Sequence, residues 1–445
     1  MNHAEKLTGW ASSKLAEIIS PQSSICYGVL MPGEFTPNGI PLIRVKDINK
    51  NIVNDEQIFL ISQELDSEFK RSKVTAGTIL VSIQGTVGCV AITPEHLENA
   101  NISRTIAKLE LAEPVMSKWI WASLLSPQGQ EKMLEETGGS TRASLNISAL
   151  REIELPIPPL GEQTRIAQKL DELLAQIDTL KARIDAVPAL LKRFRQSVLA
   201  AAVSGRLTQE WRGVESADEL NSLNAGLPTR WSTVPLGRYA INHDGAREPI
   251  SAKERETRKG NHPYFGATGQ IDSIDGYTHD GEFVLVGEDG ANLLTRVKPI
   301  AFLAKGQIWV NNHAHVIASP AGHSNSYLAI YLNTLDITPW VSGSAQPKLN
   351  QKNMNEIPVH VPPPAEQTEI VRRVEQLFAF ADQLEAKVAT AQARIDRLTQ
   401  SILAKAFRGE LVPQDPNDEP ASLLLERIQA QRAAAPKAKR GRKSA

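Results

Sequence analysis

The chain has little cysteine, no excess of charge of either sign and no long apolar run. Its only cysteines are Cys26 and Cys89, which excludes a disulfide framework and a cysteine-rich metal site. No run of about 18 apolar residues occurs, so no membrane-spanning helix is expected. The start, MNHAEKLTGW, lacks the apolar stretch of a signal peptide. We therefore expect a soluble protein of a reducing compartment, without membrane contact.

The charge balance and the absence of catalytic motifs exclude further classes of function. The chain has 49 Lys plus Arg against 50 Asp plus Glu, which argues against coating nucleic acid by net charge but allows a focused basic face. It contains no phosphate loop of the form G-x-x-x-x-G-K-[ST], no H-E-x-x-H and no G-x-S-x-G. His313 and His315 have no third ligand nearby in sequence, so no metal site is predicted. We expect no catalytic residue in this chain.

What the chain does contain is one segment present twice, without a gap. Leu145-Asn146 recurs as Leu349-Asn350, a shift of 349 − 145 = 204 residues, and Glu162-Gln163-Thr164 recurs as Glu366-Gln367-Thr368. Two copies are too few for a solenoid, which needs at least about three. The duplication instead predicts two equivalent halves related by a pseudo-two-fold axis.

Each copy holds a heptad pattern of apolar residues, with steps of four and three sustained over about five heptads. This pattern predicts two helices that pair as a coiled coil, with the helix from Ile166 to Val198 extending roughly 50 Å. The alternative is that each helix covers its own globular domain. Sequence does not give the direction of pairing, although a pseudo-two-fold axis across the rod makes it antiparallel. The predicted core residues are Ile166, Leu170, Leu173, Ile177, Leu180, Ile184, Val187 and Leu191, with Ile370, Val374, Leu377, Ala381, Leu384, Val388, Ala391 and Ile395.

The ends of both helices are marked. A proline pair precedes each one, and a helix does not extend back through such a pair. Gly205 and Gly409 stand where C-terminal caps belong. Pro188 interrupts the first copy where the second has Gln392, and we expect a kink there that costs about 3 kcal/mol if nothing compensates.

The regions outside the helices are mixed in character and share features. Strand-like runs occur at 78–83 and 283–286, closely preceded by Gly77 and Gly281, and Trp10 and Trp231 stand in similar contexts at the two starts. The two regions therefore look homologous although their sequences have diverged. A short helix is expected around Leu423–Gln431, before the basic tail PKAKRGRKSA.

Polar and basic residues that follow or flank the predicted strands are candidates for reading DNA. Arg, Lys, Asn and Gln pair with base edges in the major groove, and Lys and Arg neutralise phosphate. Each stretch taken alone is also typical of a solvated loop. The candidates in the first region are Arg44, Lys46, Asn49, Lys50, Gln84, Ser103, Arg104 and Arg142, and those in the second are Lys253, Arg255, Arg258, Lys259, Tyr264, Asn311, Asn312, His313, His315, Gln346 and Lys348.

This layout resembles the specificity subunit of type I restriction-modification systems, over essentially the whole chain. The matching motifs are LPIPPLGEQTRIAQKLDELLAQIDTLKARI and its copy VHVPPPAEQTEIVRRVEQLFAFADQLEAKV, each a helix start followed by heptads. The endings QSVLAAAVSGRL and QSILAKAFRGELVPQDP, with HPYFGATGQID and PLIRVKDIN in the mixed regions, are also similar to this family.

The resemblance implies an α+β fold, in which two mixed α/β target-recognition domains are separated by two long helices that form an intramolecular antiparallel coiled coil. Each domain would read one half of a bipartite, asymmetric target in double-stranded DNA, and the helices would set the spacer and dock two methyltransferase subunits. Those partners would use S-adenosylmethionine to methylate adenine at N6, and nuclease–translocase subunits would use ATP and Mg2+. The chain itself would bind no cofactor and act in the cytoplasm of a prokaryote, in defence against phage.

The predicted domain limits follow from these features. They are target-recognition domain 1 at 1–155, helical region 1 at 156–208, a linker at 209–227, target-recognition domain 2 at 228–359, helical region 2 at 360–412 and a C-terminal segment at 413–445. Two other functions remain possible from the sequence: a coiled-coil scaffold that binds proteins, and an enzyme such as a nuclease whose site is hidden in the divergent domains.

Overall fold

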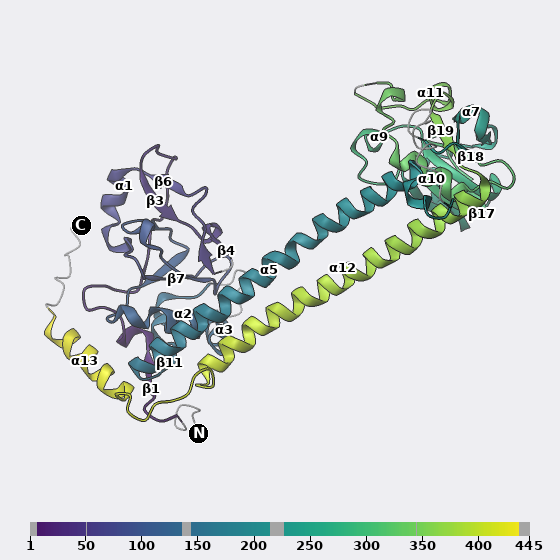
Figure 1. Ribbon diagram of the computed structural model, residues 1–445. Helices are drawn as coiled ribbons and strands as arrows, with labels where there is room; N and C mark the ends of the chain where they lie inside the picture. Colours follow the sequence, from purple (N-terminus) through teal and green to yellow (C-terminus); the bar gives the residue numbers. More distant parts are fainter. Residues whose placement is uncertain (1–6, 50, 136–143, 214–226, 344, 436–445) are drawn as a thin grey trace. The chain divides into compact units, whose positions relative to one another are not determined.

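The computed structural model describes residues 7–49, 51–135, 144–213, 227–343 and 345–435, which divide between two compact units. One unit comprises Met1–Ile184 with Thr390–Ala445, and the other comprises Asp185–Ala389. Each unit combines antiparallel sheet with helices around its own apolar core, so the fold is α+β as predicted (Figure 1). The pseudo-two-fold axis that the duplication predicts between the two units stays a prediction.

The first unit is built on a four-stranded antiparallel sheet of order β2-β10-β7-β8. Its central strand β7 is buried along its whole length, as expected for the apolar run that follows Gly77. The strands are β2 (Cys26–Tyr27), β7 (Ile79–Ser82), β8 (Val90–Ile92) and β10 (Ile106–Leu109). Two smaller sheets contain β3 (Ile40–Ile43), β6 (Phe59–Ile61) and β9 (Asn101–Ile102), and β4 (Ile48–Asn49) and β5 (Ile52–Val53). The short helices are α1 (Gln63–Glu68), α2 (Ser117–Leu125), α3 (Pro127–Glu135) and α4 (Ile147–Glu152).

The second unit is built on a six-stranded sheet of order β13-β18-β16-β17-β14-β15. All pairs are antiparallel except β14 with β17, which is parallel. The strands are β13 (Ile241–Asn242), β14 (Lys259–Gly266), β15 (Gly269–Ile274), β16 (His279–Gly287), β17 (Ala301–Val310) and β18 (Ala314–Ala318). The short helices are α7 (Leu236–Tyr239), α8 (Ala252–Thr257), α9 (Asn292–Thr295), α10 (Asn325–Thr334) and α11 (Gln351–Asn355).

The two units share one strand order. The order β2-β10-β7-β8 in the first matches β13-β18-β16-β17 in the second. In the first, Ile106 lies opposite Ser82, and in the second Ala314 lies opposite Gly287. The shift between corresponding residues of β7 and β16 is therefore 287 − 82 = 205, one more than in the helical copies. This common frame agrees with the predicted homology of the two mixed regions.

The two long helices have the predicted ends. Helix α5 (Leu160–Val203) and helix α12 (Pro364–Phe407) each have 44 residues and begin beside the proline pairs. Gly205 and Gly409 follow with φ of 78° and 70°, the left-handed conformation of a C-terminal cap. Helix α5 continues through Pro188 without a break. The predicted kink at Pro188 stays a prediction.

Within each unit the helices pack antiparallel, because the start of one lies against the end of the other. In the first unit, Ile166 and Leu170 of α5 share a core with Ile402 of α12. In the second unit, Val198 of α5 shares a core with Ile370 of α12. Ion pairs join the helices in both units, Lys181 Nζ to Asp396 Oδ1 at 3.0 Å and Arg195 Nη1 to Glu385 Oε1 at 2.7 Å. The heptads thus form the predicted intramolecular coiled coil.

Burial along the predicted coiled-coil core is uneven. The buried members are Ile166, Leu170, Ile177, Leu191, Ile370, Val374, Ala381 and Ile395, while Leu173, Ile184, Val187, Leu377, Leu384, Val388 and Ala391 are half-buried. Leu180 is 47% exposed, so it is not an enclosed core residue. Two helices alone cannot surround every a and d side chain, and several of the buried members, such as Ile166 and Ile370, also pack in the cores of the sheet domains.

A buried hydrogen bond explains the repeated glutamate at the helix starts. Trp10 Nε1 donates to Glu162 Oε2 at 2.9 Å, and Trp231 Nε1 donates to Glu366 Oε2 at 3.0 Å. Each helix start is thereby tied to the strand that opens its unit. These strands are β1 (Ala11–Lys14) and β12 (Ser232–Pro235), which pair with β11 (Glu154–Ile157) and β19 (Pro358–Val361) just before the helices.

The C-terminal segment adds a helix to the first unit. Helix α13 (Ala421–Ala434) spans the predicted helix, and it buries Leu424 and Ile428 in the core that also contains Trp10 (Figure 1). Arg432 donates from Nη1 to the carbonyl of Ile19 at 3.1 Å. The basic tail lies outside the described residues. None of the helices described is both long and apolar enough to cross a membrane.

Candidate nucleic-acid interface

In the first unit, three chain segments meet where the central strands end. We call the meeting point of residues 83–84, 103–105 and 144–146 the first junction. The amide of Ile83 donates to the carbonyl of Thr105 at 2.8 Å, and the amide of Leu145 donates to the carbonyl of Ile83 at 2.9 Å. Gln84 and Ser144 form an isolated β-bridge. The junction therefore joins the end of β7 and the start of β10 to the segment that leads through α4 into α5.

The second unit repeats this arrangement at residues 288–289, 311–313 and 348–350, the second junction. The amide of Glu288 donates to the carbonyl of His313 at 2.9 Å, and the amide of Leu349 donates to the carbonyl of Glu288 at 2.7 Å. Asp289 and Lys348 form the matching bridge. The backbone frame is therefore the same in both units, and only the side chains differ.

The first junction gathers several of the predicted residues. Gln84 and Arg104, both exposed, line a hollow of about 270 Å3 with Tyr27 and Leu30. Gln84 also lines a wider hollow of about 600 Å3 with Lys46, Asn49 and Thr105. Neither Lys46 nor Arg104 forms an ion pair within the described part of the chain. Two hollows that share Gln84 thus present one cation each, Arg104 in the first and Lys46 in the second.

Other predicted residues of the first unit lie elsewhere or are occupied. Arg44 binds Asp47 through Nε at 3.0 Å, and its guanidinium lies over the ring of Phe59 at 4.8 Å. Ser103 belongs to the junction but is buried, and its hydroxyl is 2.8 Å from that of Thr105. Lys50 and Arg142 lie outside the described residues.

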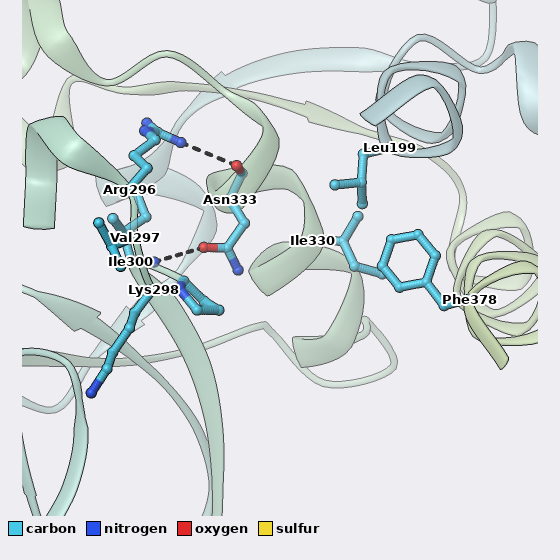
Figure 2. A pocket seen from close by; sticks show the side chains of 9 residues that line it. Leu199, Arg296, Val297, Lys298, Ile300, Ile330, Asn333 and Phe378 are labelled. Carbon is cyan, nitrogen blue, oxygen red and sulfur yellow. Dashed lines mark hydrogen bonds between the residues drawn. The ribbon is translucent and has the colours of Figure 1, made fainter. Parts of the chain in front are cut away.

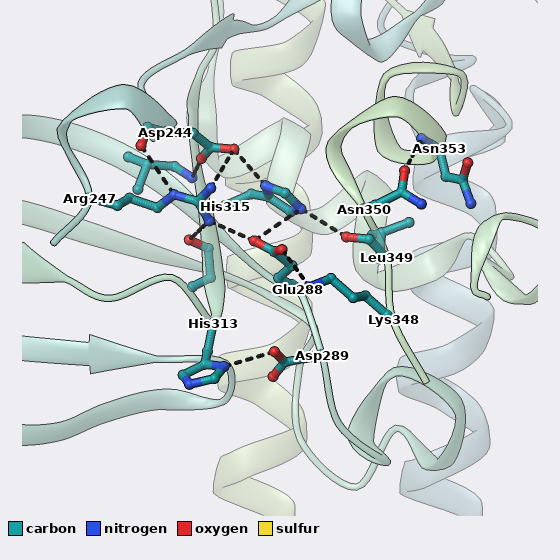
Figure 3. Close-up of polar contacts among 12 residues, drawn as sticks. Asp244, Arg247, Glu288, Asp289, His313, His315, Lys348, Leu349, Asn350 and Asn353 are labelled. Carbon is teal, nitrogen blue, oxygen red and sulfur yellow. Dashed lines mark hydrogen bonds and ion pairs between the residues drawn. The ribbon is translucent and has the colours of Figure 1, made fainter. Parts of the chain in front are cut away.

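A buried polar network packs against the second junction (Figure 3). His315 is 1% exposed, and its two ring nitrogens lie 2.6 Å from Asp244 Oδ2 and 2.8 Å from the carbonyl oxygen of Leu349. Both partners are acceptors, so both nitrogens donate only when the ring is an imidazolium. Arg247 bridges Asp244 and Glu288. This network ties β18 to the segment that leads to α11.

The same contacts control the two carboxylates. Burial would raise the pKa of Asp244, but hydrogen bonds from His315 and the Val316 amide outweigh it and hold that pKa below its ordinary value. The pKa of Glu288 is also lowered, because the hydrogen bond from Arg247 and the charge of His315 outweigh burial. Both groups therefore stay ionised at neutral pH and fix the cations around them.

The exposed face of the second junction carries charges of both signs. His313 is half exposed, and its Nδ1 lies 2.7 Å from Asp289 Oδ2. Lys348 is also half exposed, with Nζ 3.3 Å from Glu288 Oε1. Asn312 and Gln346 are exposed, whereas Asn311 is 5% exposed and accepts the His313 amide at 2.8 Å. His313, Asn312 and Lys348 therefore meet at one surface, with Asp289 among them.

The remaining basic residues predicted in the second unit hold its structure. Arg255 contacts Asp272, and its guanidinium lies over the ring of Tyr264 at 4.8 Å. Arg258 pairs with Asp275 at 3.0 Å and Lys259 with Asp272 at 2.7 Å. Tyr264 is 1% exposed and His315 equally buried, so neither side chain reaches the surface. Lys253 is exposed and lies on α8, outside the second junction.

Sequence reasoning missed Asp289, which occupies the place of Gln84. A signal was present, because a glycine follows each residue, Gly85 with φ of 81° and Gly290 with φ of 104°. Aligning these glycines gives the shift of 205 that the sheets have, rather than the 204 of the helices. Asp244 and Arg247 had no comparable signal, because their partners are distant in sequence.

An apolar hollow of about 360 Å3 is a second feature of this unit (Figure 2). It is lined by Leu199 of α5, Ile330 of α10 and Phe378 of α12, and by the loop that contains Val297, whose side chain is 84% exposed. Arg296, with φ of 49°, holds this loop by donating to the carbonyl of Asn333 at 3.0 Å. Residues of both long helices thus line the hollow, and no residue of the second junction does.

No group of three or more potential metal ligands occurs among the described residues.

Comparison with known proteins identifies relatives over most of the chain. A family model for the type I restriction modification DNA specificity domain matches residues 10–189 and 241–391. The specificity subunit of the type I restriction enzyme EcoDI of Escherichia coli is 36% identical over 360 residues, covering 74% of this chain and 80% of that protein. The specificity subunit of EcoBI, also from Escherichia coli, is 33% identical over 457 residues, covering 91% and 89%.

Solved structures agree in fold. The HsdS subunit from Thermoanaerobacter tengcongensis superposes with a TM-score of 0.58 at 18% identity, covering 91% of this chain and 98% of that chain. A chain from a structural study of complex assembly and conformational transition of the type I R-M system gives a TM-score of 0.60 at 18% identity, covering 91% and 99%.

Proposed function

The chain belongs to the family of type I restriction-modification DNA specificity subunits, and from this premise we propose that each junction contacts one half of a two-part DNA target. The observation that carries the proposal is the repeated junction. One backbone frame presents Gln84 and Arg104 in one unit and Asp289, Asn312 and Lys348 in the other. Two equivalent frames with different side chains suit a target whose two halves differ in sequence.

The long helices would set the distance between the two half-sites. Each is 44 residues long and each crosses the boundary between the two units, at Ile184 in α5 and Ala389 in α12. A rigid connection of this kind converts two weak half-site affinities into one strong affinity that depends on spacing. The ion pairs Lys181–Asp396 and Arg195–Glu385 support this role, because they fix the register of the helices inside each unit.

The helices would also dock two methyltransferase subunits. The apolar hollow of Figure 2 supports a protein partner, because Leu199 and Phe378 of the long helices line it together with an exposed Val297. Methylation of adenine at N6 would then be the work of the partner, which would bind S-adenosylmethionine. Nuclease–translocase subunits would use ATP and Mg2+ in the full complex. This chain would supply the choice of site and no reacting group.

The test is a genome-wide map of adenine methylation. Cells that express this chain with its methyltransferase are compared with cells that lack only this chain. A two-part motif that disappears with the chain would support the proposal and give the target sequence. An identical map in both strains, with the two proteins expressed and associated, would contradict it and favour a scaffold that binds proteins without choosing DNA.

A further inference from the structure

One backbone position has opposite chemistry in the two units. Gln84 and Asp289 each follow the central strand and bridge the segment that leads towards the long helix. The Gln84 amide offers a donor and an acceptor, whereas the Asp289 carboxylate only accepts. Asp289 Oδ2 accepts from His313 Nδ1 at 2.7 Å, and Oδ1 has no hydrogen bond within the described residues. One carboxylate oxygen is therefore held in place while the other stays available.

A carboxylate at a DNA surface restricts what it can face. Phosphates and carboxylates repel one another, and like charges brought together at an interface cost several kcal/mol. In the major groove the amino donors are N4 of cytosine and N6 of adenine. Adenine also presents its N7 acceptor beside N6, which repels a carboxylate, whereas cytosine presents the donor alone. An amide such as that of Gln84 instead matches the donor and acceptor of adenine.

We propose that Asp289 is a specificity-determining residue, which selects cytosine at one position of the half-site read by the second unit. His313 Nδ1 fixes the carboxylate, 2.7 Å from Oδ2, and Arg247 and Lys348 pair with the adjacent Glu288, so that second carboxylate is matched by two cations. Gln84 has the corresponding place in the first unit and is complementary to adenine. This inference rests on the proposed function, since it names the chemistry by which one junction chooses a base.

The purely structural alternative is that Asp289 and His313 only stabilise the loop after β16. The two readings differ in what a neutral isostere does. Asp289→Asn keeps the size of the side chain and one acceptor for His313, but adds a donor. A structural role predicts an unchanged methylation motif, or at most a less stable protein. A reading role predicts a changed base at one position, because an asparagine amide pairs with adenine.

The experiment maps adenine methylation in cells that express the methyltransferase with the wild-type chain, Asp289→Asn, Gln84→Ala or Glu282→Gln. At one position of one half-site, Asp289→Asn should allow methylation of sites that carry a base other than cytosine. The ratio of methylation at these sites to methylation at cytosine sites should rise by about tenfold. Gln84→Ala should change only the other half-site. Glu282→Gln is the matched control, because it neutralises an exposed carboxylate on β16, the strand that precedes Asp289, and this carboxylate pairs with Lys305.

The outcomes separate this inference from the proposed function. An unchanged motif in Asp289→Asn, with full methylation that still requires the chain, would overturn the role of Asp289 and leave the proposed function standing. A change in the same half-site as Gln84→Ala would overturn it equally. If Asp289→Asn does not assemble with the methyltransferase, Asp289→Ala replaces it, and an unchanged motif in that variant would likewise overturn the role of Asp289. A map that never depends on the chain would reject the proposed function itself.

Discussion

Replacing Arg212 with methionine removes the cation that faces a buried carboxylate. The side chains of Arg212 and Glu366 are 7% and 1% exposed and form an ion pair. Thr208 and Trp231 also donate to Glu366, at 2.7 and 3.0 Å. Arg212 further donates to the carbonyl of Gly205 at 2.7 Å, so it joins the end of α5 to the start of α12 within one unit. Methionine keeps the bulk of the side chain but leaves the carboxylate without its counter-charge.

The expected loss is large because the pair is enclosed. Removing one partner of a buried ion pair costs about 3–5 kcal/mol. For a domain of about 150–250 residues, 1 kcal/mol lowers the melting temperature by roughly 2–4 °C. A loss of about 3 kcal/mol therefore lowers the melting temperature of the unit Asp185–Ala389 by roughly 6–12 °C. The control Arg165→Met breaks a pair with Asp418 whose arginine is 35% exposed, and more exposed pairs contribute about 1 kcal/mol or less.

Calorimetry of the full chain measures the shift, and hydrogen exchange locates it. Peptides around Trp231 and Glu366 should exchange faster in Arg212→Met, while peptides of α2 and β7 in the other unit should not change. A melting temperature within about 2 °C of the wild type, with unchanged exchange near Glu366, would refute the reasoning. It would mean that Thr208 and Trp231 satisfy the carboxylate without the cation.

Glu162→Gln should raise the melting temperature at neutral pH but not below pH 4.5. Burial raises the pKa of Glu162 in the folded chain, so the protonated carboxyl stabilises the fold fully at acid pH, and this contribution is lost as pH rises through the folded-state pKa. An equal gain in melting temperature at acid pH, measured by calorimetry, would contradict this reasoning. Lys46→Ala should weaken DNA binding by the assembled complex equally for all sequences. The slope of log affinity against log salt concentration should fall in magnitude by about 0.9, because one phosphate contact is lost. A change in the preferred bases would instead show that Lys46 contacts bases. One heptad inserted at matching places in α5 and α12 should lengthen the helices by about 10 Å, and the methylation map should show a longer spacer with both half-sites unchanged.

The helices were predictable because their signals are local. Steps of three and four residues define the buried face, the proline pairs prevent extension backwards, and Gly205 and Gly409 cap the ends. The order of the sheet strands needed the fold, since β14 pairs with β17 in parallel across a long separation in sequence. The limits predicted for the six segments were based on the same local signals, and they stay predictions.

The interface was less predictable because its residue types do not reveal their partners. Arg255, Arg258 and Lys259 have the composition of a phosphate-binding stretch, yet Asp272 and Asp275 on the adjoining strand and loop neutralise them. Lys46 and Arg104 form no ion pair among the described residues, and the acid next to Lys46, Asp47, pairs with Arg44 instead. A basic side chain is free to bind DNA only if no carboxylate pairs with it. The carboxylates that pair with the structural cations are brought near them by folding, so the sequence does not show them.

The two halves differ in sequence at the junctions but not at the helix starts, because main-chain atoms make the contacts at the first place and side chains make them at the second. At the junctions, main-chain amides and carbonyls make the joining hydrogen bonds, so Gln84 can correspond to Asp289 without loss of the frame. At the helix starts the joining hydrogen bonds run between side chains, from Trp10 to Glu162 and from Trp231 to Glu366, both buried. A substitution that removes the donor or the acceptor leaves a buried polar group without its partner, which costs about 1–3 kcal/mol. A surface built on backbone contacts can therefore change its DNA-reading side chains while the connection to the helices keeps its sequence.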